Sequence, residues 1–504
     1  MTKMEPALRI EANAAAREAA PGVERIDVEA VASKAARSAY AQRQKIYPKL
    51  AHGTFRNVKW LVMAVTLGIY YMLPWIRWDR GPRLPDQAFL LDFANQRLFF
   101  GPFEIWAQEL YYITGILIVS AFGLFLVTSV AGRMWCGYTC PQTVWTDLMV
   151  VVERFWQGDR NARIRLDREP WTFEKVWKKG ATHLTWMLIG ALTGGAFVFY
   201  FRDAPTLARE LVTGEAPAVA YVFFGLFTFT TYLLGGIARE QVCIYMCPWP
   251  RIQSAMFDRD SLLISYRPYR GEPRGAHKKG QSWEGRGDCI DCRACVAVCP
   301  MGIDIRDGIQ LECIQCALCI DACDEIMTKI DKPRGLIGYD SFRNLDAASH
   351  HEREPLRILR PRTIAYSGLI ALVLAVMLWA WTSRAQVELS VIQDRNPLFV
   401  TLSDGGVRNG FTVKILNKWH QAREFRMRIE GLPSAKLTIV GFDHDDPAIE
   451  VQTDTLRALK VYVTVPQSAR AGLDSEAKPF VFVVTDTTNG SAIFRETAFR
   501  SAAK

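Results

Sequence analysis

Four cysteines form two copies of one short pattern. The stretch WCGYTCP begins at Trp135 and VCIYMCP begins at Val242, and both read Cys-x-Tyr-x-Cys-Pro after a long apolar run. Thiolates at this spacing could bind a soft metal ion, exchange disulfides or support another cofactor. Copper(I) suits soft thiolates, whereas disulfide exchange usually employs the tighter Cys-x-x-Cys. The residues concerned are Cys136, Cys140, Cys243 and Cys247.

The other eight cysteines form two runs of a different pattern. CIDCRACVAVCP begins at Cys289 and CIQCALCIDAC begins at Cys313, and each run reads C-x2-C-x2-C-x3-C. In bacterial ferredoxins with this spacing, the fourth cysteine of each run ligates the other cluster. Zinc is less consistent with the runs, since zinc sites usually show paired C-x2-C knuckles. We therefore expect two [4Fe–4S] clusters, one on Cys289, Cys292, Cys295 and Cys323, and one on Cys313, Cys316, Cys319 and Cys299.

Each thiol pair at the end of an apolar run requires a break in the helix. Cys140 and Cys247 both precede a proline, which disfavours helical geometry at the cysteine and suits the first position of a new helix. A thiol at a helix start has its anion favoured by the exposed N–H groups, and Arg133 and Arg239 would act in the same direction. The sequence thus predicts lowered thiol pKa values at these pairs.

Five apolar runs have the length needed to cross a bilayer. Buried helices of a soluble protein would keep a polar face, which these runs lack. The runs lie at about 58–78, 111–132, 182–203, 216–238 and 362–383.

The connecting segments alternate in charge. Lys and Arg are concentrated before the first run, between the second and third, and between the fourth and fifth, whereas 79–110 and 204–215 are acidic. By the positive-inside rule, the N-terminus and the ferredoxin block are cytoplasmic and the C-terminal segment is periplasmic. A reducing compartment disfavours disulfides in the block. The net charge of +9 belongs to these loops, and no basic helix suited to reading bases is present, which excludes a nucleic-acid partner.

Residues 384–504 alternate apolar and polar positions in six short runs: VELSVIQ, GFTVKILNKW, EFRMRIEGL, KLTIVGF, LKVYVTVP and FVFVVTDT. Several short strands separated by Gly, Pro, Asn and Asp indicate a β-sandwich, here without an inter-sheet disulfide. His420 and His444 suit surface or packing positions better than metal ligation.

Together these features predict a multidomain α-helical membrane protein with five transmembrane helices, a bacterial-type 2[4Fe–4S] ferredoxin domain and a C-terminal immunoglobulin-like β-sandwich. We place a mobile or loosely helical cytoplasmic tail at 1–57 and the four-span membrane domain with both thiol pairs at 58–238. The cytoplasmic ferredoxin domain follows at 239–361, the fifth transmembrane helix at 362–383, and the periplasmic β-sandwich at 384–504.

The paired motifs, the ferredoxin block and the stretch CPWPRIQSAMFDRDSLLISY from Cys247 resemble the FixG/RdxA/CcoG family of bacterial membrane ferredoxins. The resemblance covers essentially the whole chain beyond the N-terminal tail. It implies a multi-pass protein of the bacterial inner membrane that reduces Cu(II) to Cu(I) for assembly of cbb3-type cytochrome c oxidase. It also implies that copper, as substrate or bound ion, is held and reduced at Cys136, Cys140, Cys243 and Cys247.

Two other functions fit the same residues. The protein could be a quinol-linked electron-transfer subunit, or a non-enzymatic assembly factor that holds copper. The partners implied are the cytoplasmic membrane, oxidase assembly factors and a copper transporter or chaperone that accepts the ion. The electron donor is unknown, and a homodimer remains an open option.

Overall fold

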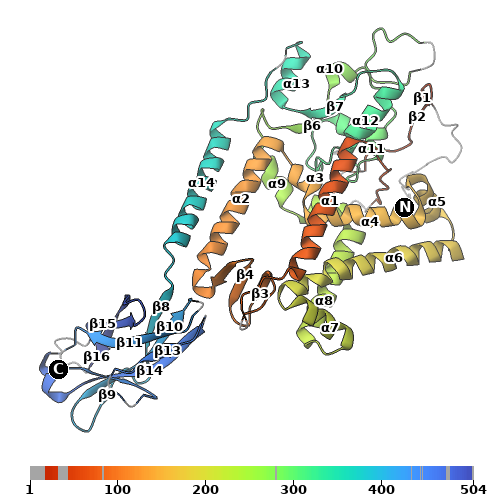
Figure 1. Ribbon diagram of the computed structural model, residues 1–504. Helices are drawn as coiled ribbons and strands as arrows, with labels where there is room; N and C mark the ends of the chain where they lie inside the picture. The colour runs from red at the N-terminus through yellow and green to blue at the C-terminus, as the bar shows by residue number, and fades with distance from the viewer. Residues whose placement is uncertain are drawn as a thin grey trace, which may run out of the picture. The chain divides into compact units, whose positions relative to one another are not determined.

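The structure is a computed structural model that describes residues 18–31, 44–81, 84–277, 281–352, 354–419, 421–432, 434–442, 444, 446–453, 455–472 and 477–501 (Figure 1). The contacts divide the chain into two compact units, Met1–Met377 and Leu378–Lys504, with the boundary inside the helix α14. Each unit is described by itself.

Among the described residues, five helices are long and apolar enough to cross a membrane. They are α1 (Thr54–Met72), α2 (Tyr111–Ala131), α6 (Phe173–Thr193), α8 (Ala218–Thr231) and α14 (Pro361–Thr382). The short helices η2 (Leu73–Trp75), η4 (Gly195–Tyr200) and η5 (Tyr232–Ala238) continue α1, α6 and α8. The predicted number and order of the spans are confirmed, although α6 begins earlier than expected because its charged first turns remain helical.

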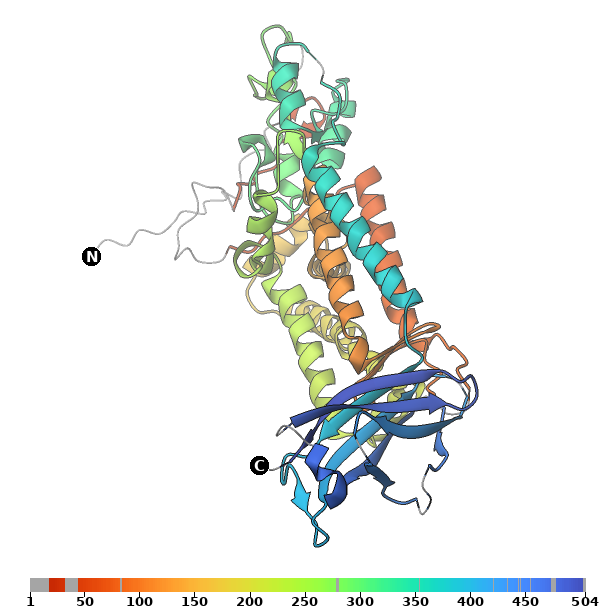
Figure 2. The ribbon, with the colours of Figure 1, turned by 90° about the vertical axis from the view of Figure 1, so that its left-hand side faces the viewer.

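Glycine lets α6 and α8 approach closely. A Cβ on Gly190 would lie 2.9 Å from the carbonyl oxygen of Thr228, and one on Gly194 would meet the carbonyl of Phe227. Such contacts of small residues are how helices associate where there is no water to drive them together. α2 and the first part of α14 also run side by side, with the rings of Phe122 and Tyr366 6.2 Å apart (Figure 2).

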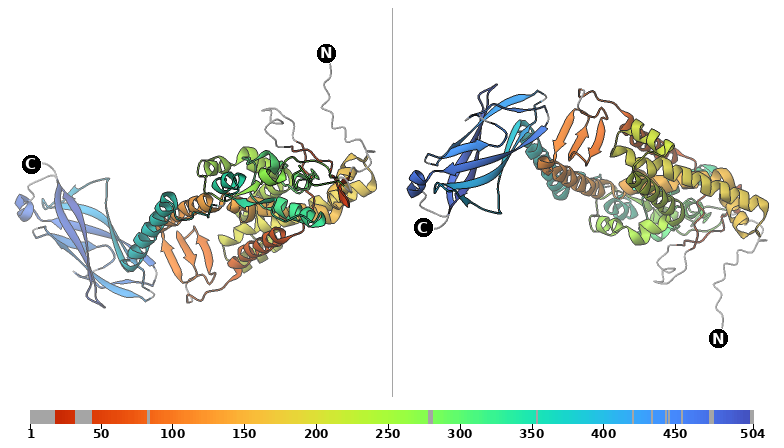
Figure 3. Two further views of the ribbon diagram at one scale, coloured as in Figure 1. Left: turned by 90° about the horizontal axis from the view of Figure 1, so that it is seen from above. Right: turned by 90° about the horizontal axis from the view of Figure 1, so that it is seen from below.

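Short elements connect the long helices. Between the second and third spans lie α3 (Met134–Tyr138), α4 (Pro141–Gln157) and α5 (Arg160–Arg168), and between the third and fourth lies α7 (Ala204–Thr213). A three-stranded antiparallel sheet, missed in the sequence, lies between the first two spans: β3 (Phe89–Asp92), β4 (Arg97–Phe100) and β5 (Phe103–Trp106) (Figure 3). The short turns between its strands were the signal.

The ferredoxin region surrounds a two-stranded antiparallel sheet of β6 (Leu263–Tyr266) and β7 (Ile337–Asp340). Its helices include α11 (Ala294–Ala297) and α12 (Leu318–Lys329), which packs against the start of α1. The remaining elements are η6 (Val242–Met246), α9 (Trp249–Ser254), α10 (Pro268–Gly271), η7 (Ile305–Asp307) and α13 (Phe342–Ser349).

The carboxylate of Asp321 on α12 fastens this region to α1. Its two oxygens accept hydrogen bonds from the backbone N–H groups of Phe55 (3.1 Å) and Arg56 (2.7 Å), so the ferredoxin region supplies the cap of the first membrane helix. Gly53 makes room for this carboxylate, because a Cβ there would lie 2.4 Å from it.

The N-terminal segment differs from the predicted mobile or loosely helical tail. Its described residues include the strands β1 (Glu18–Ala20) and β2 (Val23–Glu24), and stretches without helix or strand whose backbone bonds to the ferredoxin region. Ile26 N donates to Cys292 O at 3.0 Å, and Lys49 N donates to Ala297 O at 2.8 Å. For residues 18–31 and 44–53 the tail prediction is therefore wrong; the rest of the tail lies outside the described residues.

The second unit is a sandwich of two antiparallel sheets with fully buried phenylalanines between them, including Phe411, Phe425 and Phe482 (Figure 3). The order of one sheet is β12-β14-β10-β8 with β9 on β10, and that of the other is β13-β11-β15-β16.

The predicted strand runs are confirmed as β8, β10, β11, β12, β14 and β15, whereas β9, β13 and β16 were missed. His444 is exposed, and His420 lies outside the described residues. The strands are β8 (Val387–Gln393), β9 (Val400–Thr401), β10 (Val407–Asn417), β11 (Arg423–Glu430), β12 (Lys436–Ile439), β13 (Ile449–Val451), β14 (Thr455–Val465), β15 (Ala477–Asp486) and β16 (Ala492–Arg500).

Candidate electron-transfer site

Two cavities in the ferredoxin region gather the eight cysteines of the two runs. The first cavity is lined by Cys289, Cys292, Cys295 and Cys323. The second is lined by Cys299, Cys313, Cys316 and Cys319, and Cys295 also reaches its wall. Each predicted ligand set therefore surrounds one cavity, with the fourth cysteine coming from the other run.

The two cysteine loops share one backbone conformation. Residues two and four positions after the first cysteine are left-handed in both loops: Asp291 and Arg293 in one, Gln315 and Ala317 in the other. Alternating helical hands turn successive N–H groups into a concave nest for an anion. In the second loop, for example, the N–H of Gln315 donates to the thiol of Cys313.

These cavities fit a four-iron cluster better than a single ion. Among the described residues, no three His, Cys, Asp or Glu side chains lie close enough to hold one metal ion together. A four-iron cluster instead spreads its ligands around a cage, as the thiols here are spread around each cavity. Burial raises the pKa of Cys299 to about 12 and that of Cys313 to about 11, so both would be thiolates only beside added positive charge.

The two Cys-x-Tyr-x-Cys-Pro motifs repeat a fold as well as a pattern. The chain breaks at Gly132 (φ 59°, ψ −129°) and at the equivalent Arg239 (φ 44°, ψ −112°), four residues before the first cysteine of each motif. The second cysteines, Cys140 and Cys247, are both extended, with ψ of 126° and 122°. The predicted breaks are confirmed; α4 begins at Pro141, whereas α9 begins one residue after Pro248.

The four thiols of the two motifs converge, and we refer to them as the four-thiol group. Cys243 interacts electrostatically with Cys140, Cys136 and Cys247, although the motifs are far apart in sequence. The thiol of Cys136 donates to Oε1 of Gln253 at 3.2 Å. Cys136 and Cys243 are mostly covered, whereas Cys247 is exposed.

The predicted lowering of the thiol pKa is wrong for the first cysteine of each motif. Burial raises the pKa of Cys136 and of Cys243 to about 12, and the neighbouring thiolates add to this effect. Arg133 does lower the pKa of Cys136, as expected, but burial outweighs it. Proton release from these thiols is therefore coupled to the arrival of a cation.

The first motif touches the loop of the second cavity. A Cβ on Gly137 would lie 2.7 Å from Ile314 O, 2.8 Å from Gln315 O and 3.0 Å from Cys316 N, so only glycine permits this approach. The next residue, Tyr138, is hydrogen-bonded through its hydroxyl to Tyr339. The four-thiol group therefore adjoins the loop that carries Cys313 and Cys316, a proximity that the sequence did not reveal.

A further cavity is lined both by Cys243 and by Ile314 of this loop. Met301 and Ile314 line both this cavity and the second cysteine cavity. Its lining also includes Arg56 and Asp147, which are joined by a buried ion pair at 2.8 Å. These shared lining residues connect Cys243 with the loop that carries Cys313 and Cys316, an arrangement that suits the movement of single electrons.

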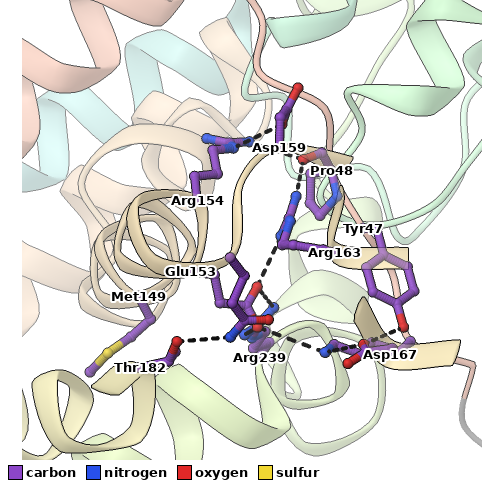
Figure 4. Close-up of polar contacts among 12 residues, drawn as sticks. Tyr47, Pro48, Met149, Glu153, Arg154, Asp159, Arg163, Asp167, Thr182 and Arg239 are labelled. Carbon is purple, nitrogen blue, oxygen red and sulfur yellow. Dashed lines mark hydrogen bonds and ion pairs between the residues drawn. The ribbon is translucent and has the colours of Figure 1, made fainter. Parts of the chain in front are cut away.

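Buried charges fix the helices behind the four-thiol group. Glu153 on α4 receives Nη1 of Arg163 at 2.9 Å and both terminal nitrogens of Arg239, at 2.7 and 3.1 Å (Figure 4). Burial alone would raise the pKa of Glu153, but these arginines and Lys45 lower it to about 2. Arg239, whose positive φ is unusual for a residue with a side chain, is thereby held in place.

Three family models match segments of the chain. Residues 238–342 match one described as "4Fe-4S dicluster domain", and residues 377–502 match "IG-like fold at C-terminal of FixG, putative oxidoreductase". Residues 113–157, which contain Cys136 and Cys140, match "4Fe-4S binding domain".

Full-length relatives are also similar. "Nitrogen fixation protein FixG" of Rhizobium meliloti is 50% identical over 88% of this chain and 91% of its own length. The chain belongs to the FixG family. "Protein RdxB" and "Protein RdxA" of Cereibacter sphaeroides are each 49% identical, over 92% and 85% of this chain and 97% and 91% of theirs. The chain is accordingly a multidomain membrane protein of the iron–sulfur electron-transfer class, with an immunoglobulin-like C-terminal domain.

Proposed function

We propose that this protein is a membrane-bound cupric reductase that converts Cu(II) to Cu(I) for the copper centre of cbb3-type cytochrome c oxidase. The observation that carries the proposal is the contact of Gly137 with Ile314, Gln315 and Cys316, which joins the four-thiol group to an electron-transfer loop. An electron source beside soft thiolates suits one-electron reduction of copper, since those thiolates hold Cu(I) best.

The cofactor ligands in this proposal are the two sets that line the cysteine cavities. Cys289, Cys292, Cys295 and Cys323 hold one [4Fe–4S] cluster, and Cys313, Cys316, Cys319 and Cys299 hold the other. When bound, these clusters supply electrons singly. The protein excludes water from the clusters with apolar side chains such as Ile314, and its backbone N–H groups donate hydrogen bonds to the cysteine sulfurs.

Copper is the substrate, at Cys136, Cys140, Cys243 and Cys247. Each Cu(II) takes up one electron, and the thiols that bind the ion release their protons. Each motif supplies one pair of thiols for copper, Cys136 with Cys140 and Cys243 with Cys247. Cys247 is the thiol left uncovered by protein and is therefore the first to meet an incoming ion.

The placement in the cell belongs to the same proposal. The distribution of Lys and Arg puts the N-terminus and the ferredoxin domain in the bacterial cytoplasm and the C-terminal domain in the periplasm. Tight binding of Cu(I) calls for a transporter or chaperone to accept the ion, and the periplasmic domain would meet the oxidase or its assembly factors.

The first test compares the wild-type protein with two variants after anaerobic purification. Cu(II) added to the reduced wild-type protein should reoxidise it and form a stoichiometric amount of Cu(I). The Cys289→Ala variant should bind copper but reduce less of it, whereas replacement of the whole four-thiol group by Ala should abolish both activities. Intact copper binding and reduction in that last variant would refute the site assignment. Copper binding without any reoxidation would favour a copper-holding assembly factor, and quinol-dependent reduction without copper binding would favour an electron-transfer subunit.

A second candidate for the four-thiol group is an iron–sulfur cluster, which the family model matched at 113–157 favours. Iron content separates the two possibilities. The copper proposal requires the four-thiol variant to keep the iron content of the wild-type protein, whereas a cluster at this site would be lost with the thiols.

The exchange of fourth ligands between the two runs has its own test. Cys323→Ala should remove the same paramagnetic signal as Cys289→Ala, and Cys299→Ala the same signal as Cys313→Ala. Pairing within each run, in which Cys299→Ala resembles Cys289→Ala, would show the assignment to be wrong.

A further inference from the structure

Arg133 occupies the junction between the two thiol motifs and the second cysteine loop. It follows the end of α2, and only 3% of it is exposed. Its guanidinium donates to the carbonyl oxygens of Leu311, Cys313 (3.2 Å) and Pro250, and its backbone N–H donates to Oε1 of Gln315 at 2.7 Å. One side chain thus joins the first motif, the segment after the second motif, and the cysteine loop.

The positive charge of Arg133 faces thiols on both sides. It interacts electrostatically with Cys136 and Cys247 of the four-thiol group and with Cys313 of the second cavity, and Glu312 is its acidic neighbour. The guanidinium hydrogen bonds named above go to main-chain carbonyls, which orient the charge and do not neutralise it. The equivalent position of the second repeat is Glu240, so the cation at this position is specific to the first motif, whose Gly137 lies against the loop backbone.

We propose that Arg133 is a positioning residue that couples the four-thiol group to the second cysteine cavity. It holds the loop at Cys313 by hydrogen bonds, and its charge stabilises an additional electron at that cavity. An electron makes a thiolate-bound centre more negative, and a buried cation nearby lowers the free energy of that state because the local dielectric constant is low. The inference rests on the proposed cluster ligands and does not depend on copper.

The test is a reductive titration of the full-length protein, followed by electron paramagnetic resonance in the absence of copper. Arg133→Gln should move one of the two reductive steps to more negative potential, by roughly tenfold in the reduction equilibrium, or ~59 mV for one electron. Arg133→Lys retains the charge and should stay near the wild-type potential, although it loses part of the hydrogen bonding.

Arg306 provides the matched control. Its side chain lines the first cavity and is 5% exposed, and its guanidinium pairs with Asp304 at 2.6 Å and Asp291 at 2.7 Å. Arg306→Gln should therefore move the other reductive step.

Two results would overturn the proposal. One is an unchanged titration of Arg133→Gln at wild-type iron content. The other is equal behaviour of Arg133→Gln and Arg133→Lys, in potential or in iron loss, which would mean that Arg133 acts through its hydrogen bonds alone. If the reductive titrations of the Arg133 variants give the expected shifts but the protein does not reduce Cu(II), the copper proposal is refuted and the proposed role of Arg133 stands.

Discussion

Replacement of Gly137 by alanine tests the contact on which the proposed electron path depends. The added Cβ would lie 2.7, 2.8 and 3.0 Å from three backbone atoms of the loop Ile314–Cys316. Backbone atoms cannot rotate away as a side chain can, so the motif and the loop must separate by some tenths of an ångström. Such overpacking costs typically about 1–3 kcal/mol.

The sign of the stability change in Gly137→Ala is diagnostic, because helix propensity alone would make alanine stabilising at this position. Gly137 lies within α3, and a Gly to Ala change in a helix ordinarily stabilises it by roughly 0.5–1 kcal/mol. Gly123 in α2 is the matched control, since a Cβ there has nothing within 4 Å. Gly123→Ala should therefore be neutral or stabilising, and Gly137→Ala should be destabilising.

Two measurements on the detergent-solubilised protein separate these outcomes. The half-life of the visible iron–sulfur absorbance at raised temperature reports how firmly the loop is held. The rate of reoxidation by Cu(II) after reduction reports transfer to the four-thiol group. We expect Gly137→Ala to shorten the half-life and slow the reoxidation. Wild-type values for both in Gly137→Ala would show that the motif does not touch the loop.

Three further predictions concern buried carboxylates. Asp321→Ala removes the acceptor of two N–H groups at the start of α1 and should destabilise the protein by about 1–3 kcal/mol in thermal unfolding. The control, Asp324→Ala, loses only the single 2.8 Å hydrogen bond from the N–H of Gly335 and should destabilise the protein less. Glu153→Gln leaves two buried guanidinium groups without their carboxylate and should lower the free energy of unfolding by about 3–5 kcal/mol. The control, Glu169→Gln, lies in an exposed ion pair and should lower it by under about 0.5 kcal/mol. Equal losses of unfolding free energy in the two variants would contradict this account. Because the pKa of Glu153 is lowered from 4.5 to about 2, its contribution is present above pH 4.5 and lost as the pH falls towards 2, so acid should destabilise the wild-type protein more than Glu153→Gln over that window.

The patterns that the sequence predicted are those in which local chemistry decides the structure. The apolar runs gave the spans because length and composition suffice to identify a membrane helix. Likewise, the prolines after Cys140 and Cys247 disfavour helical geometry wherever they stand, and both breaks are present.

What the sequence did not predict depends on burial and on contacts between distant segments. Arg163 counted in the sequence as one of many loop cations, yet it is fully buried and paired with Glu153. The expected lowering of the pKa at Cys136 failed for a related reason, since the sequence shows the nearby arginine but not the loss of solvent. Gly137, in turn, is an ordinary motif residue until the fold places it against Ile314.

Two equal motifs therefore do not make a symmetrical site. Tyr138 of the first motif is 7% exposed and bonded to Tyr339, whereas the equivalent Tyr245 is 67% exposed. The residue before each tyrosine also differs. Gly137, which has no side chain, lets a neighbouring backbone approach, whereas the side chain of Ile244 prevents such an approach. The backbone repeat brings the thiols together, but the two motifs meet the cysteine loop differently: Gly137 lies against its backbone, whereas Cys243 and Ile244 pack against the apolar cluster that contains Ile314. In the proposed reaction, electrons would thus arrive through the first motif, while Cys247 of the second remains open to the ion.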